Sequence, residues 1–171
     1  MTKKKVIIGI TALVLTVFAF LTWYKIHYSM DVAESFEVNT SELKHRVLIA
    51  TQGSEFKDAI VAGIIDHLKQ RHAYIKVIDI AALPLVNEDK WNAVVVIHTW
   101  ENWKPQADAK AYLEHVKNLS KVIVLTTSGD GDYKIEGVNA ITSASVMTDI
   151  PTRTLDINKR LDSILERDVQ T

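Results

Sequence analysis

Near its start the chain has an uncharged run of nineteen residues, from Val6 to Tyr24 (VIIGITALVLTVFAFLTWY). At about 1.5 Å per residue, a helix of this length nearly crosses a hydrocarbon layer of roughly 30 Å. Trp23 and Tyr24 end the run, where aromatic rings favour the membrane interface, and Lys25 follows them. The sequence therefore predicts a basic flank at residues 1–5 and a transmembrane anchor at residues 6–26.

A cleaved signal peptide is the alternative to an uncleaved anchor. Its apolar region would be shorter, and small residues would mark the cleavage site, whereas the run ends in bulky side chains. Lys3, Lys4 and Lys5 should stay in the cytoplasm by the positive-inside rule. We therefore expect a single-pass protein of the cell membrane, with a cytoplasmic N-terminus and its domain outside the cytoplasm.

Charge is unevenly distributed along the chain. The first 30 residues hold four of the 20 basic residues and no acidic residue, so the remainder, with all 21 acidic residues, carries a net charge of −5. Nucleic-acid binders need clustered Lys and Arg, so nucleic acid is not an expected partner. The chain has no cysteine, which excludes disulfides, thiolate metal sites and thiol nucleophiles.

Residues 27–44 are polar, show no sustained apolar period, and are predicted to form a tether. Beyond them, short apolar runs alternate with segments of helical period. Strands are expected at residues 46–51, 74–80, 93–99, 121–127 and, more weakly, 138–142. Helices are expected at residues 55–70, from Pro105 through Leu119, and after Pro151. This alternation predicts an α/β domain over residues 45–167, with a doubly wound, five-stranded parallel sheet.

Ligands of doubly wound sheets bind beyond the carboxyl ends of the strands, so the loops there carry the candidate site. Thr51, Gly53 and Ser54 follow the first strand and precede a helix. Hydroxyls and free N–H groups at a helix N-terminus can cradle a phosphate. The alternative is a turn in which Ser54 only caps the helix, and the charge of Glu55 counts against a phosphate there.

Two tryptophans, Trp100 and Trp103, lie in the segment His98 to Pro105 that follows the third strand. Large aromatic side chains are costly to expose, so the pair either caps the sheet or lines a pocket in which a flat ring can stack. His98 has no acidic or hydroxyl partner nearby in the sequence and is expected to be structural.

The loop after the fourth strand contains Gly129, Asp130, Gly131 and Tyr133. Its glycines allow a tight path that offers N–H groups to a ligand, and Tyr133 offers a ring. An acidic turn without a ligand is the alternative. An EF-hand calcium loop is excluded by spacing, because Lys134 and Ile141 would stand at ligand positions.

Together, the three loops resemble those of the flavodoxin family, and the match runs from about His45 to Glu166. The resemblance rests on Thr51-Gln52-Gly53-Ser54, on the tryptophan segment, and on Gly129-Asp130-Gly131-Asp132-Tyr133, which is similar to the family's Gly-x-Gly-Asp-x-x-Tyr loop. It implies a flavodoxin-like fold that binds FMN noncovalently and exchanges electrons with a membrane redox protein. Thr51, Gly53 and Ser54 would hold the phosphate. Trp100 or Trp103 would flank the ring together with Tyr133, in a pocket completed by the loop of Gly129, Asp130 and Gly131.

A flavodoxin-like domain without a cofactor, serving as a binding or assembly module of the cell envelope, is the alternative from another class. Gln52 and Glu55 stand where the family has hydroxyl residues and favour this alternative. The tryptophan segment would then contact a protein. No catalytic constellation is evident, because Gly-x-Ser-x-Gly and His-Glu-x-x-His motifs are both lacking.

Overall fold

The computed structural model describes residues 3–28 and 30–167. Met1 and Thr2 of the predicted basic flank and Ser29 of the predicted tether lie outside the described residues. The chain divides into two compact units, residues 1–30 and residues 31–171.

The first unit is the helix α1 (Lys3–Tyr28), which contains the predicted anchor. Residues 3–24 have a mean hydropathy of 2.4, so this helix is long and apolar enough to cross a membrane. The hydroxyls of Thr16 and Thr22 donate hydrogen bonds to the carbonyls of Ala12 and Phe18, at 3.0 and 2.9 Å. These bonds satisfy both hydroxyls inside the helix, as an apolar surrounding requires.

The second unit is built on a mostly parallel sheet. Its strands lie in the order β1 (Phe36–Val38), β3 (Ala73–Asp79), β2 (His45–Thr51), β4 (Ala93–Glu101), β6 (Val122–Thr127) and β7 (Ala140–Ser143), and β5 (Lys104–Pro105) pairs with β4 alone. The five strands from β3 to β7 in this order are parallel. Counted among themselves they have the order 2-1-3-4-5 of flavodoxin-like folds. The predicted doubly wound, five-stranded parallel sheet is confirmed.

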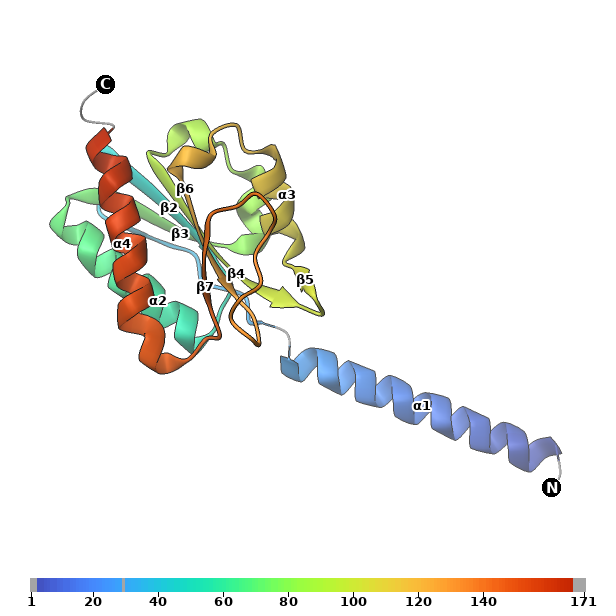
Figure 1. The fold of residues 1–171 in the computed structure, drawn as a ribbon. Coiled ribbons are helices and arrows are strands. Elements are labelled where there is room, and N and C mark those ends of the chain that lie inside the picture. Colours follow the sequence, from blue (N-terminus) through green and yellow to red (C-terminus); the bar gives the residue numbers. More distant parts are fainter. Residues whose placement is uncertain (1–2, 29, 168–171) are drawn as a thin grey trace. The chain divides into compact units, whose positions relative to one another are not determined.

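Helices cover both faces of this sheet (Figure 1). On one face α2 (Glu55–Gln70) and α4 (Ile150–Arg167) lie side by side; the short helix η1 (Ile80–Leu85) and α3 (Ala107–His115) cover the other. Three single turns complete the helical elements: η2 (Glu88–Lys90), η3 (Leu119–Lys121) and η4 (Met147–Asp149). The central strands are therefore buried on both sides, which explains their unbroken Val and Ile runs.

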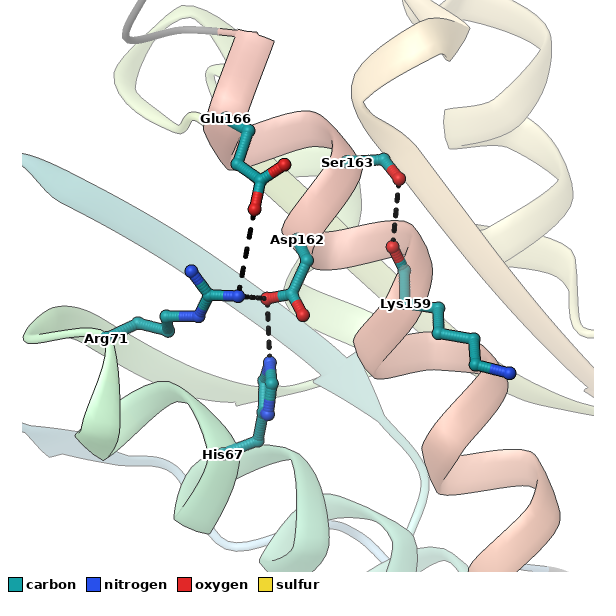
Figure 2. Close-up of polar contacts among 6 residues, drawn as sticks. All are labelled: His67, Arg71, Lys159, Asp162, Ser163 and Glu166. Carbon is teal, nitrogen blue, oxygen red and sulfur yellow. Dashed lines mark hydrogen bonds and ion pairs between the residues drawn. The ribbon is translucent and has the colours of Figure 1, made fainter.

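Polar contacts join α2 to α4 above their apolar interface. Asp162 accepts hydrogen bonds from Arg71 at 2.9 Å and from His67 at 2.8 Å, and Glu166 lies 3.8 Å from Arg71. Figure 2 shows both carboxylates turned toward α2, whereas Lys159 points away from Arg71 and His67. The carboxylates of Asp162 and Glu166 therefore pair with the basic side chains at the end of α2.

The segment predicted as a tether is largely part of the domain. The carbonyl of Asp31 accepts a hydrogen bond from the Gly53 N–H at 2.7 Å, and the Ala33 N–H donates to Asp79 at 2.8 Å. Strand β1 pairs antiparallel with β3. Backbone groups make most of these contacts. Because backbone pairing requires no regular spacing of apolar residues, the sequence did not predict that this segment joins the domain. The compact unit therefore begins at Asp31 rather than at His45.

The helix predicted to begin at Pro105 begins later. Pro105 lies in β5, opposite Trp100, and the side chain of Gln106 caps α3 by accepting from the Ala109 N–H at 2.7 Å. The helix ends at His115, so Leu119 lies beyond it. Residues 128–139, all of them described, contain no helix.

Candidate functional site

The three predicted loops meet at one edge of the sheet. Thr51 pairs with Ile97 of β4, and Thr99 of β4 pairs with Thr127 of β6, so the carboxyl ends of β2, β4 and β6 are adjacent. All nine predicted site residues lie at this carboxyl edge or in the loops that leave it: Thr51, Gly53, Ser54, Trp100, Trp103, Gly129, Asp130, Gly131 and Tyr133.

The chain's own N-terminal segment lies across the first loop. The Gly53 N–H, which would face a phosphate, donates to the Asp31 carbonyl. A Cβ atom on Gly53 would lie only 3.0 Å from both the Cβ and the carbonyl oxygen of Asp31. Glycine at position 53 therefore permits this close approach, and the backbone of Asp31 stands where a ligand oxygen would bind.

The hydroxyls of the first loop are engaged within the chain. Thr51 is buried and donates to the Gln52 carbonyl at 3.1 Å, and Ser54 caps α2 by accepting from the Lys57 N–H at 3.3 Å. The adjoining groove, of about 450 Å³, is bordered by four carboxylates: Asp31, Glu34, Glu55 and Asp58. Since these charges would repel a phosphate dianion, this loop as arranged does not fit the phosphate of FMN.

The aromatic side chains predicted to flank a flavin touch each other instead. Trp100 and Tyr133 stack with ring centroids 5.5 Å apart and planes 14° apart. A flat ring held between two others needs them about 7 Å apart, twice the usual contact distance between carbon atoms. The space for a flavin ring between these two side chains is therefore closed.

Trp103 does not join this stack but lies at the tip of a hairpin. Glu101 pairs with Lys104, so Asn102 and Trp103 form a two-residue turn. Their φ angles are +50° and +60°, which is the backbone of a type I′ turn. The segment predicted as a connecting loop is thus an ordered hairpin, and the Trp103 side chain is 84% exposed at its end.

A polar network that was not predicted from the sequence joins α2 to the carboxyl ends of β4 and β6. Lys57 is 1% exposed and donates to the Thr99 hydroxyl at 2.6 Å, and that hydroxyl lies 2.9 Å from the Thr127 hydroxyl. Burial lowers the pKa of Lys57 to about 8. The sequence did contain a signal for this buried lysine, because Lys57 lies one helical turn before Val61 on the apolar face of α2.

The side chain of Gln52 ties the first loop to β4. Its amide oxygen accepts from the Thr99 N–H at 2.8 Å, and its amide nitrogen donates to Glu101 at 3.0 Å. A threonine at position 52 could not span both partners. The departure from the flavodoxin pattern at this position therefore replaces a ligand-facing hydroxyl with a structural link.

His98 lies inside the domain and, contrary to the expectation from the sequence, has a hydroxyl partner. It is fully buried, its Nε2 atom lies 3.0 Å from the Thr126 hydroxyl, and burial lowers the pKa of His98 to about 4. Within residues 3–28 and 30–167, no group of three His, Asp or Glu side chains is placed to hold a metal ion.

No family model and no curated protein matches this sequence. Among solved structures, the chain is similar to a flavodoxin from the domain Archaea, with 9% identity and a TM-score of 0.47 over 70% of this chain and 98% of that one. It is also similar to a flavo di-iron protein from Thermotoga maritima, with 14% identity and a TM-score of 0.47 over 74% of this chain and 36% of that one. A lysine decarboxylase from Francisella novicida has 12% identity and a TM-score of 0.41 over 70% of this chain and 17% of that one.

These similarities are distant. The assignment of a flavodoxin-like fold follows from the strand order of the second unit. Function has to be argued from the carboxyl edge itself.

Proposed function

We propose that this protein is a flavodoxin-like module, held at a membrane by α1, that binds another protein at the carboxyl edge of its sheet without a flavin. The cytoplasmic N-terminus and the extracytoplasmic domain predicted from the lysines are part of this proposal. The partner is then a membrane or envelope protein.

The placement of Trp103 is the observation that carries the proposal. Both central residues of a type I′ turn need positive φ, which favours Asn, Asp or Gly, and a bulky residue there is strained by about 1–3 kcal/mol. The side chain recovers little of this cost by packing, because it is 84% exposed. An exposed tryptophan that does not help the domain fold is well suited to contact a partner, since tryptophan is enriched at the energetic centres of protein interfaces.

The experiment is photo-crosslinking in the cells that make the protein, with a benzophenone amino acid at position 103. The control carries the same amino acid at Leu85, which is 89% exposed and lines a groove with Arg46 and Tyr74, near the amino ends of β2 and β3. We expect a discrete crosslinked species from position 103 and none from position 85. Equal crosslinking at both positions, or none at either, would contradict the proposal.

Electron transfer by bound FMN is the second candidate function. The meeting of all three loops at one edge favours it, because this is where doubly wound folds bind their ligands. FMN would bring the redox chemistry, but Asp31 would first have to leave Gly53, and Trp100 would have to separate from Tyr133.

The two candidates differ in a direct measurement. On the full chain purified in mild detergent, we expect no visible flavin absorption and no saturable quenching of FMN fluorescence. A flavin that co-purifies with the chain and is lost on Trp100→Ala would establish the second candidate instead. Crosslinking from position 103 tests the first candidate separately, so the two can fail independently.

A further inference from the structure

The groove beside the first loop has an apolar floor. Its volume of about 450 Å³ falls in the range of ligand-binding clefts, and it is lined by residues of α2 and by the N-terminal segment of the domain. Val61 and Ile65 of α2 and Val77 of β3 are its buried apolar residues.

Exposed apolar side chains border the same groove. Val32, which is 82% exposed, and Phe36, which is also exposed, both line it. Phe36 lies on β1, and within residues 30–167 no further strand pairs with the outer edge of β1. Apolar side chains left open beside a groove are typical of a surface that a partner covers.

Four carboxylates gather at the groove. Glu55 and Asp58 lie in the first turn of α2, and Asp31 is held next to this turn because its carbonyl accepts from the Gly53 N–H at 2.7 Å. Glu34 is the fourth acidic residue of the lining. The start of α2 is therefore the acidic end of the groove.

These negative charges are not balanced within the groove. None of its described lining residues is basic, and no ion pair within residues 3–28 and 30–167 includes any of the four carboxylates. The dipole of α2 offers only about half a positive charge at this end. Lys57 acts on the charge of Asp58, but it is buried and donates to Thr99 at 2.6 Å.

The charged and apolar parts of the groove follow each other along α2. Val61 and Ile65 come about one and two turns after Asp58. From Glu55 to Ile65 the helix rises by about 15 Å, which is the length of about four or five residues of extended chain. A short segment with basic residues at one end and apolar residues at the other would match this order.

We propose that the groove binds such a segment of another polypeptide, with its basic residues at the start of α2 and its apolar residues over Val61 and Ile65. The carboxylates supply the complementary charge, and the apolar floor supplies buried area. Trp103 and Tyr133 do not line the groove, so this site does not depend on the function proposed for the hairpin.

The experiment measures the fluorescence anisotropy of a labelled peptide of three lysines followed by three leucines. The peptide is titrated with the full chain in nonionic detergent, and its signal in detergent alone is subtracted. We expect saturable binding that Glu34→Gln weakens by about threefold and Glu34→Lys by about tenfold, because reversing a charge adds repulsion to the lost attraction.

Glu42→Lys is the matched control, since Glu42 is another exposed glutamate of the N-terminal part of the domain and does not line the groove. It should leave the affinity unchanged. No saturable binding, or equal weakening by Glu34→Lys and Glu42→Lys, would overturn the proposal.

Three further probes test the kind of ligand. A peptide of three lysines and three serines keeps the charge without the apolar end, and one of three glutamates and three leucines reverses the charge. We expect both to bind much more weakly, and equal binding of either would overturn the proposal. Full displacement by calcium chloride, but not by sodium chloride at the same ionic strength, would assign the carboxylates to a divalent cation and would also overturn it.

Discussion

Replacing Trp103 by glycine and by alanine separates the backbone strain at the hairpin tip from the few contacts of the side chain. Trp103 has a φ of +60° and is 84% exposed. Both substitutions remove the same small contact area. Only glycine also relieves the left-handed backbone, and it creates the Asn-Gly pair that type I′ turns favour.

The expected difference follows from two opposing terms. A left-handed backbone costs a residue with a Cβ atom about 1–2 kcal/mol. Glycine also makes the unfolded chain more flexible, which destabilises the folded state by about 0.4–1 kcal/mol and offsets part of this gain. Trp103→Gly should therefore be more stable than Trp103→Ala by about 1 kcal/mol, which corresponds to about 2–4 °C in Tm for a domain of this size.

The assay is urea unfolding of the full chain in mild detergent, followed by circular dichroism. Leu85 is the matched control, because it is equally exposed but lies in the helical turn η1. There the order should invert, with Leu85→Ala more stable than Leu85→Gly by about 0.5–1 kcal/mol. An alanine variant at position 103 as stable as the glycine variant would refute the assignment of strain to this turn.

Three more predictions concern buried groups. Burial lowers the pKa of Lys57 from 10.5 to about 8, so between these pH values the Lys57 amine is protonated in the unfolded chain but not in the folded one. The free energy of unfolding, measured with urea, should therefore rise from about pH 8 to pH 10.5. Lys57→Met should abolish that rise. Since the pKa of His98 is lowered to about 4, its ring nitrogens should give the NMR shifts of neutral imidazole at pH 5.5, and shifts of a charged ring there would contradict this prediction. Gly53→Ala should push Asp31 away, cost about 1–2 kcal/mol and speed hydrogen exchange in residues 31–38. Gly129→Ala, whose Cβ meets nothing within 4 Å, should leave that exchange unchanged.

The sheet could be predicted because its central strands contain continuous apolar runs. Runs such as residues 93–97 are buried on both faces, and the sequence alone displays this pattern. The meeting of the candidate loops at one edge followed from the same inference, since parallel strands end together.

The state of the site could not be predicted, because it depends on contacts without a sequence pattern. The bond from Gly53 to Asp31 joins backbone atoms, and backbone atoms are the same in every residue type. The stack of Trp100 on Tyr133 depends on where the end of β4 and the loop after β6 lie in space. The position of Trp103 depended on recognising Asn102-Trp103 as a hairpin turn, although tryptophan is not a typical residue there.

The place of α4 in the core has a consequence for the order of events during synthesis. Ile157, Leu161, Ile164 and Leu165 belong to the main apolar cluster, yet they are made after every strand of the sheet that they cover. At about 5–20 residues per second, the ribosome needs roughly 1–4 s to make the 18 residues of α4. Until then the face of the sheet that α4 covers stays exposed. The domain can therefore complete this face of its core only after α1 has long left the ribosome, so the two units form at different times during synthesis.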